Sequence, residues 1–256
     1  MEKIVIKIVT FCNKNYIPVL KNWYLALQKI GLEQHALVIT LDDETRDTID
    51  FCDTLHRPIE VEGQNFGGLW QHRLEVLNEL LQLHNEIIHS DADAVWLRNP
   101  LPMISSLNAN IVFTQGTVWP HDVHALYGVV LCCGLFYLNN SPQAKQFVTQ
   151  IKERVINDKD DQVSVNREVA SRITGWQIEE PVLVPFRETN FTTSKAVMTS
   201  KAKNKDDDLN VCVLPHHHFP RLVESITEEV YVAHPLSGKT LDDKIRCLTN
   251  LGIWWA

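Results

Sequence analysis

The chain has 256 residues, of which 45% are hydrophobic and 22% are charged, the balance of an ordinary folded domain. This length allows one large α/β domain or two smaller ones. The formal net charge is −8, from 24 basic and 32 acidic side chains, so there is no basic excess to neutralise the phosphates of a nucleic acid. A small polyanion such as a nucleotide diphosphate remains compatible with this charge, because a bound metal supplies positive charge locally.

Two features of the sequence bear on the cellular compartment. The N-terminal apolar run is short and is interrupted by Lys7, and no other apolar run reaches the length of a membrane span. The six cysteines lack paired CxxC spacing: they are Cys12, Cys52, Cys132, Cys133, Cys212 and Cys247. Together these patterns predict a cytoplasmic protein with reduced, mostly buried thiols and no transmembrane segment.

The first half of the chain alternates predicted strands and helices. Strands are expected at 4–9, 36–41, 59–61 and 86–90, with an acidic turn at Asp42–Glu44. One helix is expected from about Pro18 to Gly31. A second is expected after Gly67-Gly68, with an apolar face made of Trp70, Leu74, Leu77 and Leu81. A strand, a helix and a strand within about 40 residues indicate a parallel βαβ unit.

The second half carries a long apolar run and two further helices. Strands are predicted at 110–115 and 129–138, the latter continuously apolar as in a central strand, with a loop at 116–127. Ser141 and Pro142 predict a helix start, a polar turn follows at 157–160, and another helix carries Asp161. Periodicity fades beyond Pro185, and 201–208 reads as a charged loop. A short strand at 230–233 and a C-terminal helix follow, so we expect a single domain over residues 1–256.

The segment EIIHSDADAVWLRNPLP at 86–102 organises the chain. Asp91 and Asp93 follow an apolar strand at spacing i, i+2, which in an extended chain places both carboxylates on one side, about 6–7 Å apart. Paired carboxylate oxygens suit Mg²⁺ or Mn²⁺, and open α/β sheets bind ligands at the carboxyl ends of strands. The alternative is a structural ion pair with Arg98, because neighbouring carboxylates repel each other unless a cation offsets them.

This segment resembles the DxD region of the nucleotide-diphospho-sugar transferases of glycosyltransferase family 77, which are related to the family 8 galactosyltransferases and glycogenins. Four further stretches extend the resemblance in order over roughly residues 1–254. They are GLWQHRLEVL with Arg73, CCGLFYLN at 132–139, DDQVSVN at 160–166 and AHPLSGKTLDDKIRCLTNLGIW at 233–254. The resemblance implies a GT-A fold, which is an α/β Rossmann-like fold with a central, mostly parallel sheet flanked by helices.

The resemblance also implies roles for individual residues. Asp91 and Asp93 would bind the metal, with His234 as third ligand and Asp91 also near the nucleotide. Gly238 and Lys239 would contact the diphosphate, assisted by Arg73, which could equally be an ordinary surface residue of its helix. The cation would be Mn²⁺ or Mg²⁺, and it would stabilise the charge that develops on the leaving diphosphate.

Asp161 and Gln162 resemble the pair that lies beside the sugar ring in these families, where Asp and Gln supply acceptors and donors for hydroxyl groups. Thr10, at the end of the first strand, is a candidate base contact, and Asp43 is a weaker candidate. The chain departs from the family pattern at Val163 and at Cys132-Cys133, so the resemblance does not assign the donor sugar.

Two histidine-rich stretches are less specific. His216-His217-His218 is predicted to belong to an acceptor-side or surface loop, with a second metal site as the alternative. Trp119, with His121 and His124 near it, is a candidate platform for a sugar acceptor.

The sequence therefore predicts a metal-dependent retaining glycosyltransferase. It would move a hexose or pentose from a nucleotide sugar, a UDP-sugar, to a glycan, protein or small-molecule acceptor. No carboxylate stands out as a nucleophile, which favours front-face displacement. The alternatives are a catalytically silent nucleotide-sugar or glycan-binding module and a DxD phosphohydrolase of the haloacid-dehalogenase type. The latter needs its DxD at the first strand, followed by a small hydroxyl residue, where this chain has Ala94-Val95.

Overall fold

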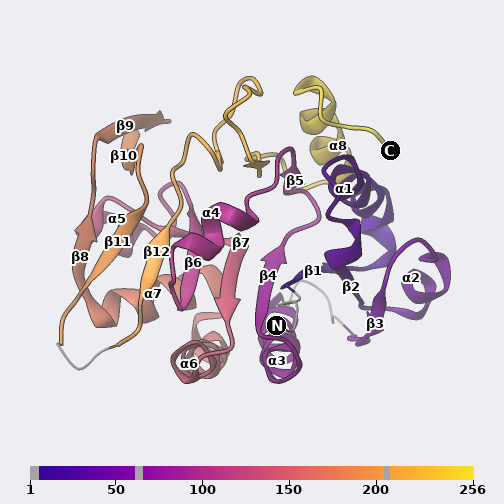
Figure 1. Ribbon diagram of the computed structural model, residues 1–256, viewed down its shortest axis with the longest axis horizontal. Coiled ribbons are helices and arrows are strands. Elements are labelled where there is room, and N and C mark those ends of the chain that lie inside the picture. Colours follow the sequence, from indigo (N-terminus) through magenta and orange to yellow (C-terminus); the bar gives the residue numbers. More distant parts are fainter. Residues whose placement is uncertain (1–5, 61–65, 205–207) are drawn as a thin grey trace.

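The computed structural model describes residues 6–60, 66–204 and 208–256. Through these residues runs a nine-stranded sheet in the order β3-β2-β1-β4-β7-β6-β12-β11-β8 (Figure 1). Its strands are β1 (Ile6–Cys12), β2 (Ala36–Thr40), β3 (Thr54–His56), β4 (Glu86–Ser90), β6 (Ile111–Gln115), β7 (Leu131–Asn139), β8 (Ile173–Gln177), β11 (Met198–Ala202) and β12 (Val211–Val213). Within this described sheet, only β7 and β11 are antiparallel to the other strands. The predicted mostly parallel α/β sheet is confirmed.

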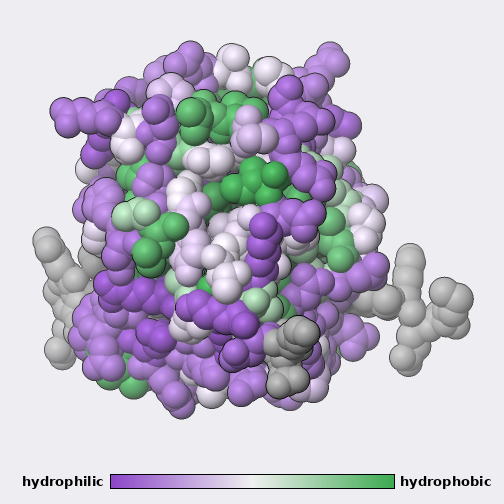
Figure 2. Space-filling view, turned by 90° about the vertical axis from the view of Figure 1, so that its left-hand side faces the viewer, coloured by the Kyte–Doolittle hydropathy of each residue, from purple (hydrophilic) through white to green (hydrophobic). Residues whose placement is uncertain are grey.

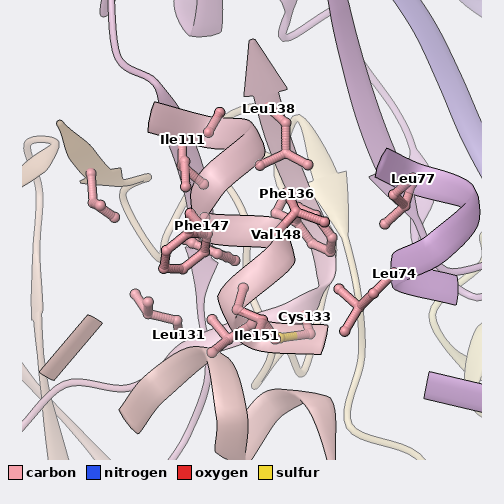
Figure 3. Close-up of a cluster of buried hydrophobic side chains, with 14 of the residues drawn as sticks. Leu74, Leu77, Ile111, Leu131, Cys133, Phe136, Leu138, Phe147, Val148 and Ile151 are labelled. Atoms are coloured by element: carbon pink, nitrogen blue, oxygen red, sulfur yellow. The ribbon is translucent and has the colours of Figure 1, made fainter. Parts of the chain in front are cut away.

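Helices cover both faces of the sheet (Figure 1). On one face lie α3 (Phe66–Leu83), α6 (Pro142–Asp158) and α7 (Asp161–Arg172), and on the other lie α1 (Ile17–Lys29), α4 (Leu101–Ser106) and α8 (Leu241–Asn250). Figure 3 shows the first interface, where Phe147 and Ile151 of α6 pack with Leu77 of α3 against the apolar side chains of β7. Each helix contributes an apolar stripe of period 3.6 to one face of the sheet.

The helix starts follow the capping signals in the sequence. The Ser141 side chain accepts a hydrogen bond from the Ala144 N–H and begins α6, with Pro142 in the first turn. The Asp160 side chain accepts from the Val163 N–H at 2.9 Å and begins α7. Gly31 has a φ of +69° just beyond α1, the left-handed conformation that glycine adopts most readily.

Several expectations are wrong in detail. The acidic turn after β2 is instead helix α2 (Asp43–Thr48), because Asp42 caps it by accepting from the Thr45 N–H at 2.7 Å. The loop expected at 116–127 contains helix α5 (His121–Tyr127). The strand expected at 59–61 is absent over Ile59 and Glu60, just after Pro58, which lacks an N–H; β3 lies at Thr54–His56 instead.

Beyond Pro185, where the sequence periodicity fades, the structure contains strands β10 (Thr189–Ser194), β11 and β12, and β10 forms a two-stranded ribbon with β9 (Pro181–Phe186). The short strand predicted at 230–233 is β13 (Val232–Ala233), which pairs with β5 (Val95–Trp96). The expected charged loop at 201–208 begins inside β11. Parts of three predicted segments, residues 4–5, 61 and 205–207, lie outside the described residues.

The surface over the β8 end of the sheet is largely hydrophilic, with separate apolar patches (Figure 2). Among the exposed apolar side chains, Leu126 belongs to α5, and Val182 and Leu183 belong to β9. None of the described helices combines the length and apolar character needed to cross a bilayer. All six cysteines are free and Cys12, Cys132, Cys133 and Cys212 are buried, so the prediction of mostly buried thiols is confirmed.

Strand β7 is irregular where it passes β6. Phe113 of β6 pairs with Phe136, but the next residue, Thr114, pairs with Cys132, so the intervening residues of β7 bulge out of that ladder. The bulge is held by Thr114 Oγ1, which donates to the Leu135 carbonyl at 3.1 Å. Bulges re-aim side chains at the rims of sheets. This one lies at the carboxyl end of β4, where Ser90 pairs with Leu135.

Asn166 ties α7 to the start of β7, and we predict that Asn166→Ala lowers the free energy of unfolding by about 3 kcal/mol. Its side chain accepts from the Leu131 N–H at 2.7 Å and donates to the Leu131 carbonyl at 2.9 Å, both in buried surroundings. The substitution leaves these backbone groups without partners. Urea denaturation measures the loss, with the exposed Asn157→Ala as control. Equal stability of the two variants would contradict the predicted role.

Candidate active site

A cavity of about 290 Å³ lies at the carboxyl end of β4, beside the bulged start of β7. The side chains that line it include six that the resemblance assigned to the metal or the donor: Arg73, Asp91, Asp93, Asp161, Gln162 and His234. Segments far apart in the chain supply them, namely helix α3, the turn after β4, the first turn of α7 and the loop after β13. The cavity therefore lies at the sheet edge where parallel α/β folds place their ligands.

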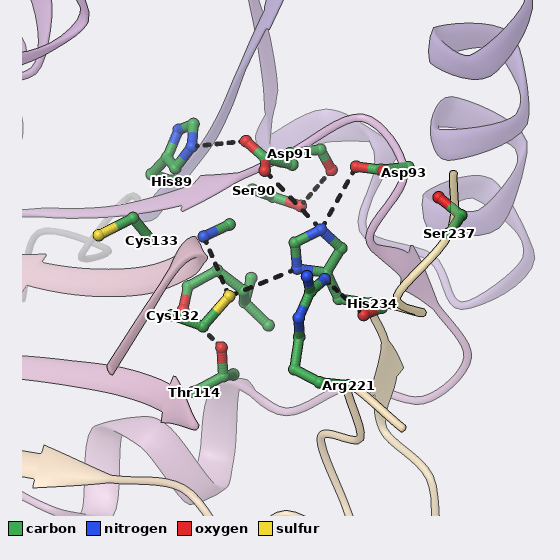
Figure 4. A network of polar contacts seen from close by, with 12 residues as sticks. His89, Ser90, Asp91, Asp93, Thr114, Cys132, Cys133, Arg221, His234 and Ser237 are labelled. Atoms are coloured by element: carbon green, nitrogen blue, oxygen red, sulfur yellow. Dashed lines mark hydrogen bonds and ion pairs between the residues drawn. The ribbon is translucent and has the colours of Figure 1, made fainter. Parts of the chain in front are cut away.

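Asp91, Asp93 and His234 form a compact cluster whose ligand atoms all lie within 4.8 Å of one another. His234 Nε2 lies 3.4 Å from Asp93 Oδ1 and 3.7 Å from Asp91 Oδ2 (Figure 4). Two carboxylates and an imidazole converging in this way suit Mn²⁺ or Mg²⁺, with further oxygen ligands completing the shell. The residues present fit a divalent cation.

Strand pairing delivers His234 to this cluster. Ala233 in β13 pairs with Val95 in β5, so the segment just before His234 lies beside the segment just after Asp93. The His234 N–H donates to the Pro220 carbonyl at 3.1 Å, and Arg221 Nη1 donates to the His234 carbonyl at 2.7 Å. The loop that contains the three consecutive histidines thus braces the candidate metal ligand.

Gly134 leaves the space in which the cluster forms. A Cβ at this position would lie 1.9 Å from His234 Cε1 and 2.8 Å from Asp91 Oδ2, closer than any real contact. The Gly134 carbonyl also accepts from the Asp91 N–H at 2.7 Å, which fixes the turn after β4. The lack of a side chain at Gly134 is therefore a requirement of the site, because larger residues would displace a candidate ligand.

Asp91 is held as a carboxylate by its neighbours. His89 Nε2 lies 3.1 Å and Arg73 Nη1 lies 3.4 Å from Asp91 Oδ1. Burial raises the pKa of Asp91, but the hydrogen bond with His89 and the guanidinium of Arg73 outweigh it and lower that pKa to about 2. Burial and the nearby Arg73 lower the pKa of His89 to about 4, so His89 is neutral at pH 7.

Asp93 has cationic partners on both of its oxygens. Lys244 of α8 forms an ion pair with Oδ2, while Oδ1 faces His234. Burial alone would raise the pKa of Asp93, but His234 and Lys244 hold it far below its usual range. Burial and Arg221 lower the pKa of His234, whereas Asp93 raises it, and the result is a pKa of about 9. The imidazole thus takes up positive charge readily between the carboxylates.

The predicted sugar-side pair is joined to the same network. Arg73 forms a buried ion pair with Asp161, and its guanidinium packs over the Trp70 ring. Gln162 Nε2 donates to the Trp119 carbonyl at 2.9 Å, and Gln162 Oε1 accepts from the Cys133 N–H at 3.4 Å. Arg73 is therefore a buried residue of the site and not a surface residue of an amphipathic helix.

The profile of the nucleotide-diphospho-sugar transferase family matches residues 31–247, which is most of the chain. The chain belongs to this family. It is also 22% identical, over 242 residues, to the arabinosyltransferase RRA2 of Arabidopsis thaliana. That match covers 80% of this chain and 55% of the relative, so the chain spans about half the length of that protein. The family resemblance noted in the sequence is confirmed, and the architecture is consistent with the GT-A fold.

Three residues that were predicted to contact the nucleotide, Thr10, Gly238 and Lys239, do not line the cavity. Thr10 is fully buried in β1, and Lys239 is exposed. At Gly238 a Cβ would lie 2.3 Å from Asp243 Oδ2, so this glycine allows close packing against the first turn of α8. Their roles in nucleotide binding stay predictions.

The remaining sequence candidates have partners of their own. Asp43 is exposed and forms an ion pair with Arg46 at 2.7 Å. Arg98 donates to the Glu228 carbonyl and stacks on Tyr231, so the alternative that it neutralises the DxD carboxylates is wrong. Arg73 and Lys244 do so instead.

The histidine-rich stretches also differ in placement. His216 is buried and its Nε2 accepts from the Arg221 N–H at 3.2 Å, whereas His218 Nδ1 lies 2.7 Å from the Glu229 carbonyl. Trp119 lines the cavity and is 49% exposed, with its ring edge-on to His121 at 5.3 Å. His216–His218 are thus part of the loop that braces His234, and Trp119 remains a candidate acceptor platform.

Sequence reasoning missed two cations that line the cavity, Arg221 and Lys244. Lys244 lies at the fourth position of α8 and Arg221 follows an irregular, proline-bounded loop. The only lysine that the sequence singled out near the C-terminus was Lys239, through its place after Gly238. No local spacing marked Lys244, because its partner Asp93 lies 151 residues away.

We predict that Gly134→Ala weakens Mn²⁺ binding by at least about tenfold, because the added Cβ displaces His234 or Asp91 from the cluster. Isothermal titration calorimetry with Mn²⁺ measures this change. Gly175→Ala, in β8, is the matched control, since a Cβ there has no neighbour within 4 Å. Wild-type affinity in a folded Gly134→Ala protein would contradict the assignment.

The raised pKa of His234 predicts opposite pH trends for stability and metal affinity. A histidine whose folded pKa of about 9 exceeds the ordinary 6.5 stabilises the metal-free fold fully below pH 6.5, and this contribution is lost as pH rises through 9. Metal binding requires a neutral imidazole, so Mn²⁺ affinity should rise over the same interval. Denaturation and calorimetry from pH 6 to pH 9.5 measure both, and flat profiles would exclude this linkage.

Proposed function

We propose that this chain is a metal-dependent retaining glycosyltransferase that moves a hexose or pentose from a UDP-sugar to a glycan, protein or small-molecule acceptor. The observation that carries the proposal is the convergence of Asp91, Asp93 and His234 in a cavity that also holds the buried Arg73–Asp161 pair. Membership of the nucleotide-diphospho-sugar transferase family supports a nucleotide-sugar donor.

Asp91, Asp93 and His234 would hold Mn²⁺ or Mg²⁺. When bound, such a cation supplies Lewis-acid stabilisation of the charge that develops on the leaving diphosphate. The chain contributes further positive charge around this position through Arg73, Arg221 and Lys244, all of which line the cavity.

Asp161 and Gln162 are suited to holding the donor sugar. Their positions are fixed by Arg73 and by hydrogen bonds to the backbone of Trp119 and Cys133. A carboxylate and an amide in fixed positions discriminate among sugar hydroxyls by accepting and donating hydrogen bonds. Asp161 and Gln162 would therefore orient the sugar ring for transfer.

The partners of the cavity carboxylates favour front-face displacement over a covalent intermediate. Asp91 and Asp93 belong to the candidate metal cluster, Asp160 caps α7, and Asp161 is bound to Arg73. Each described carboxylate that lines the cavity thus has a partner that lowers its nucleophilicity. In the proposed mechanism the acceptor attacks on the side of the leaving group, and the anomeric configuration is retained.

The relative described above is an arabinosyltransferase, so pentose donors should be tested beside hexose donors. That protein is 22% identical, so both pentose and hexose donors belong in the panel. UDP-arabinose, UDP-xylose, UDP-galactose, UDP-glucose and UDP-N-acetylglucosamine would be screened by thermal shift with Mn²⁺, since a ligand raises the melting temperature by mass action.

We predict that Asp91→Asn and His234→Ala each abolish Mn²⁺-dependent UDP binding while the fold persists. Each variant removes one of three candidate ligands, and the lost affinity should exceed about 100-fold. Calorimetry with UDP and Mn²⁺ measures it, with the exposed Asp50→Asn as control. Unchanged Mn²⁺-dependent UDP binding by either variant would contradict the assignment of Asp91 and His234 as metal ligands. A wild-type protein that binds a UDP-sugar without turnover on any acceptor would favour the silent-module alternative.

The stereochemistry of the product is a separate prediction. An α-linked donor should give an α-linked product, because attack and departure take place on one face of the ring. The anomeric coupling constant in proton NMR of the product reports the configuration, and a β-linkage would exclude the retaining mechanism.

A further inference from the structure

The thiol of Cys132, at the start of β7 beside the bulge, lies against His234. Cys132 Sγ lies 3.7 Å from His234 Nδ1 and accepts a hydrogen bond from the Gly134 N–H at 3.4 Å (Figure 4). The other ring nitrogen, Nε2, faces Asp91 and Asp93. The imidazole therefore stands between a sulfur on one side and two carboxylates on the other.

The neighbouring cysteine points elsewhere. Successive side chains of a strand lie on opposite faces, and Cys133 packs into the apolar cluster with Leu74 and Ile151 (Figure 3). Cys132 is 2% exposed, and its sulfur is directed at the imidazole. Of the adjacent pair, only Cys132 can act on His234 through its side chain.

The protonation of a metal-binding imidazole determines which atom is the donor in the contact between Cys132 and His234. A neutral imidazole carries one proton, and Nε2 must keep its lone pair if it is to bind a cation. The proton then lies on Nδ1 and needs an acceptor, which in metal sites is usually a carboxylate, a carbonyl or water. Here the neighbour of Nδ1 is the Cys132 sulfur, which also accepts from the Gly134 N–H.

We propose that Cys132 is a positioning residue of the candidate metal site. Its sulfur accepts the Nδ1–H of His234 and so fixes both the tautomer and the ring orientation that present Nε2 to the cation. The proposal rests on the proposed function, because it requires His234 to be a ligand. It gives a role in the site to Cys132, at which the chain departs from the family pattern.

Three variants separate hydrogen bonding from packing. Cys132→Val approximates the volume of the thiol without an acceptor, Cys132→Ala removes both, and Cys132→Ser retains an acceptor. Cys212→Ala is the matched control, since Cys212 is a buried thiol of β12 in the apolar core. Thermal melting of each metal-free protein checks that the fold is intact.

Calorimetric titration with Mn²⁺ should show affinity losses of about tenfold or more for Cys132→Val and Cys132→Ala, a smaller loss for Cys132→Ser, and no change for Cys212→Ala. Long-range proton–nitrogen NMR with Mg²⁺ should find the His234 proton on Nδ1 in the wild type. In Cys132→Val, the population of the Nε2–H tautomer should increase. A purely structural thiol would not shift the tautomer.

Wild-type Mn²⁺ affinity and an unchanged tautomer in Cys132→Val would overturn the proposal while leaving the metal site intact. A wild-type protein that binds no Mn²⁺, alone or with UDP, would overturn the proposed function and this inference with it. The two failures are therefore distinguishable.

Discussion

Four carboxylates, Asp91, Asp93, Asp160 and Asp161, line one cavity, and the described fold around it depends on how their charge is offset. Buried charges are costly unless they are paired and hydrogen-bonded, and removing one partner of a buried pair costs several kcal/mol. Arg73 binds Asp161 and Asp91, and Lys244 binds Asp93. These contacts fix α3, α7 and α8 around the end of β4. The same charges that make the site expensive to fold also preorganise it for a dication and a diphosphate.

The irregular ladder of β7 connects the sheet to this chemistry. On one side the ladder to β4 is regular up to the Ser90–Leu135 pair, and the bond from the Asp91 N–H to the Gly134 carbonyl continues it, so Gly134 lies beside Asp91. On the other side the ladder to β6 is interrupted between Phe113 and Thr114. Gly134 then supplies space and a backbone carbonyl, and Cys132 supplies a sulfur facing His234. Site geometry is thus encoded in strand register as well as in the ligands themselves.

Much of the fold and part of the site could be predicted, and the limits follow the range of the interactions. β4 matches its expected bounds because its apolar run is local, and Ser141 and Asp160 act as caps within three residues of their partners. By contrast, Lys244 is recruited by a carboxylate 151 residues away, and no periodicity in α8 reveals this. The motif after His234 drew attention to Lys239, which is exposed. Helix α5 was missed because its short, histidine-rich sequence has no apolar period.

The C-terminal segment shows why the site depends on distant packing. Buried Asn22 of α1 donates to the Ile253 carbonyl at 3.1 Å and accepts from the Trp255 N–H at 2.6 Å, and Lys29 lies over the Trp255 ring. These bonds hold the residues after α8 against α1, and α8 in turn carries Lys244 to Asp93. A buried amide that satisfies two backbone groups is hard to replace, because each group would lose its partner. The packing of the last residues against α1 therefore helps to position Lys244 beside Asp93 of the candidate metal cluster.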